Sequence, residues 1–229
     1  FATLKHFSFL LLLWLRRDLK SRYAGSVGGL VWAVLLPILT IGIFYIVFAV
    51  VLKVRIPELA NESGYFLYLL AGLLPWLVIA DGLSRATFSL ATQEQFLQKI
   101  VFPVNILPIT AVVSSLIPQL IGTVLFLGLL ADQGLLSIKL LLLPLVFACQ
   151  LILCLGLGAA LAIISVHLKD TMQIVPVVLQ IAFYSAPILY PKSIIPPVYH
   201  PLFLLNPVTG LIEVYQWIYI GLPVALLSV

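Results

Sequence analysis

Charged side chains are scarce in this chain of 229 residues, of which 9% are charged and 63% are hydrophobic. A soluble domain carries about 25% charged residues. Two long stretches, Leu30–Leu52 and Leu140–Val166, hold no Asp, Glu, Lys or Arg at all. Because a charge is costly in hydrocarbon, such gaps mark membrane spans. The scarcity of charge excludes an ordinary soluble domain and indicates a protein embedded in lipid.

The signatures of several catalytic and carrier classes are also missing. No G-x-x-x-x-G-K-[ST] segment occurs, so we expect neither P-loop nucleotide hydrolysis nor a cofactor in this chain. No Asp-rich cluster for Mg²⁺ and diphosphate occurs, and no charge is expected near the middle of a span, where ion-coupled carriers hold theirs. His6 and His200 lack nearby Cys or His partners, so we expect no metal site. Cys149 and Cys154 fall on different faces of one helix and are interpreted as packing residues. These absences leave a conduit, a scaffold or one part of a larger machine.

Long apolar blocks are present instead, and they predict an all-α polytopic membrane protein rather than a β-barrel with short alternating segments. We interpret residues 1–229 as one transmembrane domain with six transmembrane helices, the sixth of them truncated. Prolines after residue 186 interrupt runs too short to cross a bilayer, which predicts outward-facing re-entrant helices over 194–220. The spans are predicted at 30–52, 65–84, 106–130, 140–166 and 172–190, with the sixth beginning at 223–229.

Basic residues gather before the first span, where residues 4–23 predict an amphipathic helix in the headgroup layer. Asp18 and Arg22 lie four residues apart, so we predict an ion pair within this helix. Two roles for the helix stay open: anchoring that sets the topology, or contact with the diphosphate of a lipid substrate. The candidate cations for that contact are Arg16, Arg17, Lys20 and Arg22.

The distribution of positive charge predicts a cytoplasmic N-terminus, because Lys and Arg favour the cytoplasmic side of membrane proteins. These cations border the membrane and form no soluble patch, so we expect membrane lipid and no nucleic acid as a partner. With this orientation eight of the 12 Lys and Arg residues are cytoplasmic: Lys5, Arg16, Arg17, Lys20, Arg22, Arg85, Lys99 and Lys169.

Two cytoplasmic segments have patterns that suit contact with a partner protein. Residues 92–102 predict a short amphipathic helix, which either docks into a partner's groove or lies on its own membrane surface. The tight turn with His167, Lys169 and Asp170 either sets the topology or contacts the same partner. The candidate contacts of the short helix are Glu94, Phe96, Leu97, Lys99 and Ile100.

Asp81 and Arg85 also lie four residues apart, at the predicted end of the second span. An ion pair within the helix is the interpretation for them, since a proton relay would need more intramembrane carboxylates.

Aromatic residues concentrate in the first span and late in the fifth. At span ends such residues usually form interfacial belts. Phe44 and Phe48 share a helix face, and with Tyr184 they suggest an alternative, a path whose aromatic faces contact sugar rings. The candidates for this path are Trp32, Phe44, Tyr45, Phe48, Phe183, Tyr184 and Tyr190.

Five segments in order along nearly the whole chain carry a family resemblance. They are Arg17–Ser26 with Leu30-Val31-Trp32, Leu70–Trp76, Lys99–Pro103, Ser185–Pro191 and Leu205–Gly210. Together they resemble the membrane subunit of ABC-2 type exporters, in the branch that exports O-antigen, capsule and teichoic acid. The resemblance implies a homodimer in the bacterial plasma (inner) membrane, with two copies of a separate ATPase that bind ATP and Mg²⁺. It also implies coupling to the ATPase through the 92–102 helix and a gate at 194–220.

We therefore expect a transport subunit that is not itself an enzyme, a permease for a lipid-linked polysaccharide. A permease of the same architecture that exports a small amphiphile or drug stays open as an alternative. So does a protein of another class, a membrane-embedded lipid-modifying enzyme.

Overall fold

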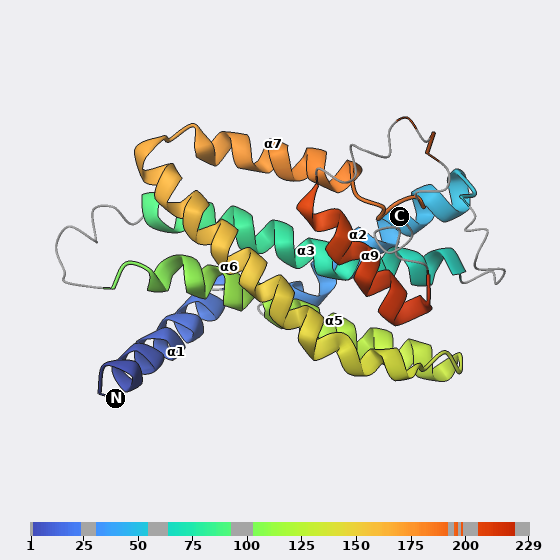
Figure 1. Ribbon diagram of the computed structural model, residues 1–229, viewed down its shortest axis with the longest axis horizontal. Coiled ribbons are helices and arrows are strands. Elements are labelled where there is room, and N and C mark those ends of the chain that lie inside the picture. The colour runs from blue at the N-terminus through green and yellow to red at the C-terminus, as the bar shows by residue number, and fades with distance from the viewer. Residues whose placement is uncertain are drawn as a thin grey trace. The chain divides into compact units, whose positions relative to one another are not determined.

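The structure is a computed structural model that describes residues 2–23, 31–54, 64–92, 103–191, 195–196, 198 and 206–222. Every regular element in these ranges is a helix (Figure 1). The prediction of an all-α polytopic membrane protein is confirmed. The α-helices are α1 (Ala2–Tyr23), α2 (Val31–Tyr45), α3 (Gly64–Ala91), α5 (Ile106–Asp132), α6 (Leu143–His167), α7 (Thr171–Tyr184) and α9 (Pro207–Ile220). A π-helical stretch η1 (Ile46–Val51) extends α2, and a 3₁₀ turn η2 (Ile138–Leu142) precedes α6.

Three helical segments of the described chain are long and apolar enough to cross a bilayer. They are α3, α5 and the continuous stretch Ile138–His167 formed by η2 and α6. The segments Leu35–Val51 and Thr171–Tyr184 are apolar but shorter. The predicted start of a sixth span at 223–229 lies outside the described residues.

Two helices end at places that differ from the expected spans. The second span was expected to end at residue 84, whereas α3 continues to Ala91, beyond two charged residues. The fifth span was expected to reach residue 190, whereas α7 ends at Tyr184 and irregular backbone follows to Pro191. Pro187 accounts for this early end, because a proline lacks the amide donor that a continuing helix needs.

The contacts divide the chain into two compact units, which we describe separately. Unit 1 comprises the described residues within 1–33, 78–118 and 150–178. Unit 2 comprises those within 34–77, 119–149 and 179–229. Helices α3, α5, α6 and α7 each contribute residues to both units.

Small residues bring the helices of unit 1 close together. A Cβ added to Gly158 of α6 would lie 3.0 Å from the Cβ of Ala86 on α3 and 3.1 Å from Val112 on α5. A Cβ on Gly82 of α3 would lie 2.8 Å from the hydroxyl of Ser115 on α5. Such small residues are typical of helix interfaces in membranes, where close packing replaces the hydrophobic effect.

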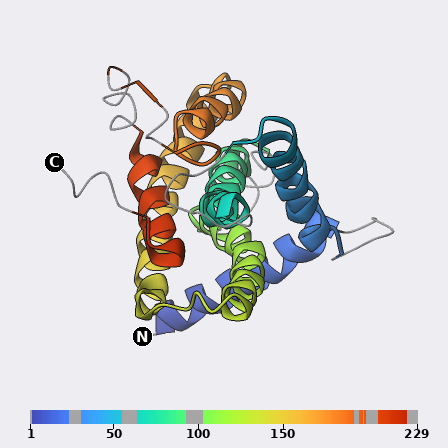
Figure 2. The same ribbon diagram turned by 90° about the vertical axis from the view of Figure 1, so that its right-hand side faces the viewer.

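The buried face of α9 forms much of the core of unit 2, beside η2 and the start of α6 (Figures 1 and 2). Tyr215 and Tyr219 of α9 stack with ring centroids 6.0 Å apart. The Tyr219 ring lies 4.8 Å from Phe126 of α5, and its hydroxyl is 3.3 Å from that of Thr123. Asn206 caps the start of α9 by accepting a hydrogen bond from the Val208 amide, and Gly221, with φ 76°, caps its end.

The close contacts of Gly158 give a stability prediction with a control in the same helix. Gly158→Leu places a bulky side chain where Ala86 and Val112 already lie, so we expect a loss of about 1–3 kcal/mol. Gly156 has no such neighbour within 4 Å, and Gly156→Leu is expected to leave stability unchanged or slightly raised. Thermal denaturation of the detergent-solubilised protein measures both. Equal melting temperatures for the two variants would contradict the packing described.

Candidate functional site

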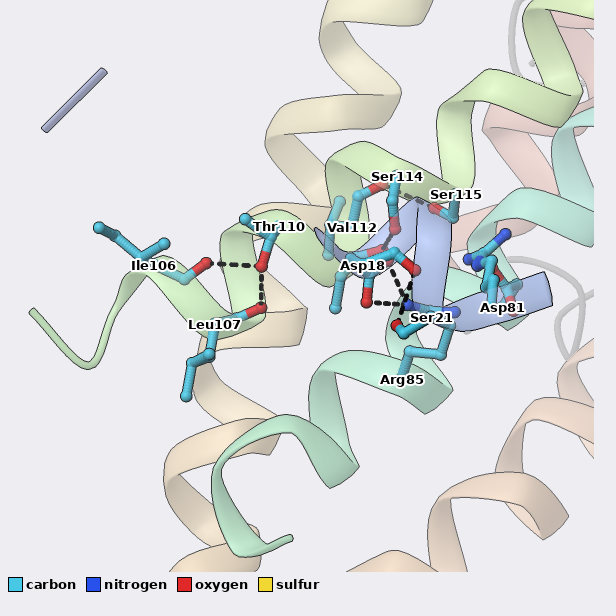
Figure 3. A network of polar contacts seen from close by, with 12 residues as sticks. Asp18, Ser21, Asp81, Arg85, Ile106, Leu107, Thr110, Val112, Ser114 and Ser115 are labelled. Atoms are coloured by element: carbon cyan, nitrogen blue, oxygen red, sulfur yellow. Dashed lines mark hydrogen bonds and ion pairs between the residues drawn. The ribbon is translucent and has the colours of Figure 1, made fainter. Parts of the chain in front are cut away.

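Two ion pairs join α1 to the end of α3 in unit 1. Arg85 of α3 meets both carboxylate oxygens of Asp18 on α1 (Figure 3). Arg22 of α1 meets the carboxylate of Asp81 on α3. All four side chains are partly buried, and Arg22 is the most enclosed, with 12% of its side chain exposed.

This arrangement corrects the pairing predicted from the spacing of the charges. The i,i+4 rule pairs Asp18 with Arg22 and Asp81 with Arg85, each within its own helix. In the structure the partners are exchanged, so each acid meets the base of the other helix. Spacing along one helix does not reveal a partner that lies 59 or 67 residues away. The same pairing explains why α3 continues past Asp81 and Arg85, because their charges are neutralised by α1.

A cavity of about 310 Å³ lies next to these pairs within unit 1. Its lining is mixed, since it combines charged side chains and hydroxyls with aromatic and aliphatic groups. The hydroxyls of three lining residues, Ser21, Ser89 and Thr110, donate to carbonyls of their own helices. The lining residues are Trp14, Arg17, Asp18, Ser21, Arg85, Phe88, Ser89, Thr92, Leu107, Thr110 and Ala111.

The four cations proposed for a lipid diphosphate do not share one environment. Arg22 is held by Asp81 and largely enclosed. Arg17 stands over the ring of Trp14, with its guanidinium carbon 4.6 Å from the ring centroid, and it lines the cavity. Arg16 and Lys20 are exposed, and so is Arg17. Arg16, Arg17 and Lys20 are therefore more accessible to an anionic headgroup than Arg22 is.

Irregular backbone follows α7 in unit 2, and side chains of other segments satisfy its carbonyl groups. The hydroxyl of Tyr68 on α3 lies 2.6 Å from the carbonyl oxygen of Pro187 and 2.9 Å from that of Tyr190. Tyr65 donates to the carbonyl of Leu189 at 2.9 Å. Gln216 of α9 donates to the same Pro187 carbonyl at 2.7 Å. Non-helical backbone at membrane depth is tolerated only where protein or water surrounds it, and these donors meet that requirement.

Asn206 connects the end of α7 to the start of α9. Its side-chain nitrogen donates to the carbonyl of Ala182 at 2.8 Å and to the hydroxyl of Ser185 at 3.0 Å. Gly72 of α3 lets the irregular segment approach, because a Cβ there would lie 3.1 Å from the Gln216 amide nitrogen and 3.4 Å from the Ile188 Cα. Glu213 and Gln216 of α9 are also buried, although the sequence pattern drew attention to neither.

Four of the aromatic residues proposed for a sugar path form one row in unit 2. Phe44 lies 6.3 Å from Phe48 and 5.4 Å from Phe183 between ring centroids. The ring centroid of Phe183 lies 5.2 Å from that of Tyr184. It also lies 5.5 Å from that of Trp76 on α3, a residue that was not among the candidates. Phe183 is buried, whereas half of Tyr184 is exposed.

The other three path candidates have different surroundings. Tyr45 packs edge-on against Phe66 of α3, with ring centroids 5.2 Å apart. The hydroxyl of Tyr190 donates to the carbonyl of Tyr184. Trp32 belongs to unit 1, so it is described apart from the row.

The turn between α6 and α7 is exposed throughout. His167 closes α6, with its Nδ1 3.0 Å from the carbonyl oxygen of Ile163. Lys169 and Asp170 lie in the turn, and the Asp170 carbonyl accepts hydrogen bonds from the amides of Gln173 and Ile174 in α7. The segment predicted as the coupling helix starts with Thr92, directly after the end of α3. The Thr92 hydroxyl donates a hydrogen bond to the Phe88 carbonyl in the last turn of α3 at 2.8 Å. The rest of the predicted coupling helix, with Glu94, Phe96, Leu97, Lys99 and Ile100, lies outside the described residues.

Comparison with known proteins places this fold in a class. Helices long enough to cross a bilayer, joined by satisfied polar contacts, define a polytopic helical membrane protein. The chain belongs to the ABC-2 type transporter family, whose model matches residues 10–220. The family resemblance carried by the five sequence segments is thereby confirmed.

Curated relatives cover most of the chain. The O-antigen export system permease protein RfbA of Myxococcus xanthus is 31% identical over 213 residues, which are 92% of this chain and 80% of that protein. A protein of the same name from Klebsiella pneumoniae is 28% identical over 202 residues, 86% of this chain and 74% of that one. The polysialic acid transport protein KpsM of Escherichia coli is 23% identical over 199 residues, 86% of this chain and 76% of its own length.

The hydrogen bonds of Tyr68 give a prediction about the irregular segment. Tyr68→Phe removes the donor shared by two carbonyl groups at a buried site, so we expect a loss of about 1–3 kcal/mol. Tyr184→Phe is the control, because the Tyr184 side chain is half exposed. The melting temperature in detergent reports both changes. A Tyr68→Phe protein as stable as the Tyr184→Phe protein would show that these hydrogen bonds contribute nothing.

Proposed function

We propose that this chain is the membrane-spanning permease subunit of an ABC exporter that moves a lipid-linked polysaccharide across the bacterial plasma membrane. The observation that carries the proposal is the set of relatives, whose names concern O-antigen export and polysialic acid transport. Their alignments cover 86% to 92% of this chain. On this proposal two copies of the chain form a homodimer, with the N-terminus in the cytoplasm.

The energy for transport comes, on this proposal, from two copies of a separate ATPase that bind ATP and Mg²⁺. The chain has no P-loop segment of its own, which supports a motor in a different subunit. The exposed turn with His167, Lys169 and Asp170 is available for contact with that subunit. The segment 92–102, predicted from the sequence as a helix and placed on the same side of the membrane by the charge distribution, is the second coupling element.

The substrate path follows from the same assignment. The exposed Tyr184, at the end of the aromatic row formed by Phe44, Phe48 and Phe183, presents a ring to which a sugar can bind. Arg16, Arg17 and Lys20 attract the anionic diphosphate of the lipid carrier at the cytoplasmic edge. The region 194–220 gates the outer end of the substrate path. Within this region α9 has one buried face.

A deletion strain tests the proposed function directly. Removal of the gene is expected to abolish the surface polysaccharide and to cause lipid-linked polysaccharide to accumulate inside the cell. Expression of the intact chain from a plasmid should restore the surface signal, measured by immunoblot of whole cells. Normal surface polysaccharide in the deletion strain would overturn the assignment, and affinity purification that recovers no ATPase would contradict the two-subunit design.

The exposed cations give a second prediction. The variant Arg16→Gln with Lys20→Gln removes two accessible positive charges, so we expect export to fall about tenfold through weaker attraction of the diphosphate. The control Arg16→Lys with Lys20→Arg keeps both charges and should export normally. Both proteins should melt at the wild-type temperature, because neither side chain is buried. Unchanged export in the Gln variant would rule out this role for Arg16 and Lys20.

A further inference from the structure

The crossed ion pairs have a second arrangement available to the same four side chains. On α1 the acid Asp18 precedes the base Arg22 by four residues, and on α3 Asp81 precedes Arg85 by the same spacing. Pairs at this spacing face each other on a helix, and an acid placed before the base is the favourable order. Each helix can therefore neutralise its own two charges, although in this structure both pairs run between the helices.

The order of the pairs shows why exchange is feasible. Going along α1 from Asp18 to Arg22, the partner on α3 moves back from Arg85 to Asp81. The two helices thus pass each other in opposite directions, and the signs alternate in the order Asp18, Arg85, Asp81 and Arg22, so that we treat the four charges as the corners of a square. Every side of such a square joins an acid to a base, whether that side runs between the helices or along one of them.

The arginines are not saturated by the bonds that they make now. The ion pairs of Arg22 and Arg85 use the terminal Nη2 atom. The Nε atom of each is buried without a hydrogen-bond partner among the described residues. A guanidinium carries five donors in a fixed fork, so each arginine keeps donors for the carboxylate of its own helix.

We propose that Asp18, Arg22, Asp81 and Arg85 are positioning residues for transport, which hold α1 on α3 through the crossed pairs and release it through the in-helix pairs. Release leaves no charge unpaired, because each acid exchanges one base for another at the low-dielectric edge of the membrane. Separation without exchange would leave four partly buried charges unpaired, which is strongly unfavourable. The export cycle uses both states, and this part of the inference rests on the proposed function.

Helix α1 covers other groups that its release would uncover. Trp14 of α1 packs against a buried cluster formed by Leu90, Leu107 and Ala162. Ser21 of α1 and Ser89 of α3 line the same cavity, which the departure of α1 would open. A short cross-link between these two serine positions therefore reports whether α1 is attached.

Charge swaps separate the two pairings, because each swap spares one pairing and damages the other. The variant Asp18→Arg with Arg85→Asp keeps both crossed pairs attractive but gives each helix two like charges four residues apart; we call it the locked variant. The variant Asp18→Arg with Arg22→Asp keeps the in-helix pairs and makes both crossed pairs repulsive; we call it the released variant. The fourfold variant with Asp18→Arg, Arg22→Asp, Asp81→Arg and Arg85→Asp keeps every pair attractive.

The experiment uses the full chain with its ATPase in membrane vesicles and in the deletion strain. Ser21→Cys and Ser89→Cys are introduced after Cys149 and Cys154 have been replaced by alanine, and a short bis-maleimide is added with or without ATP. Wild type and the fourfold variant are expected to cross-link readily without ATP, to form less cross-link in a brief exposure to the reagent during turnover, and to export normally. The locked variant should cross-link in both conditions and the released variant in neither, with export reduced about tenfold in both.

Each outcome decides between exchange and a fixed clamp. Wild-type export by the locked variant would overturn the proposal, because a clamp that only holds α1 in place needs nothing more than the crossed pairs. Failure of the fourfold variant to cross-link at rest would overturn the assignment of the pairs. If the cross-links follow the expected pattern while the intact chain exports no polysaccharide, the proposed substrate is wrong and the exchange stands, since the cross-link is read without it.

Discussion

The high cost of an unpaired polar group in hydrocarbon is the constraint on which the rest of this structure depends. A backbone carbonyl or a charge without a partner costs several kcal/mol there. Where α7 ends early, the carbonyls of Pro187, Leu189 and Tyr190, which no longer belong to a helix, all accept hydrogen bonds from Tyr65, Tyr68 or Gln216. Where charges enter the end of α3, α1 supplies a partner for each. The irregular features of the fold are therefore located where a donor or a counter-charge is in reach.

The same constraint explains how much the sequence predicts. Apolar blocks can be read from one segment at a time, because hydrophobic length is a local property, and so the helical class was predictable. The continuation of α3 to Ala91 was not, since Asp81 and Arg85 resemble the end of a span unless α1 is known to pair with them. Ion-pair partners that lie 59 and 67 residues apart in the sequence cannot be identified from the spacing of charges within one helix.

The candidate site residues also differ in whether the sequence alone could group them. Phe44, Phe48 and Tyr184 could be grouped from the sequence, because helical periodicity and shared chemistry suggest one face. Trp76 could not, because it reaches the row from α3 only after the chain has folded. Likewise, the spacing of cations on α1 does not distinguish Arg22, which Asp81 holds, from Arg16 and Lys20, which are exposed. Tertiary contacts decide which members of a sequence pattern remain free to meet a ligand.

The segments that carry the family resemblance have structural tasks wherever they are described. Three of these segments meet at one break in the helices of unit 2. They contribute Gly72 from Leu70–Trp76, the backbone carbonyls of Ser185–Pro191, and Asn206 from Leu205–Gly210. Asp18 and Arg22 of the first segment form the crossed pairs. These residues are explained by the need to satisfy polar groups in a membrane, whichever molecule is exported. On the proposed function, recognition of a particular substrate is left to side chains without such a task, and among the described residues the exposed Tyr184, Arg16 and Lys20 are examples.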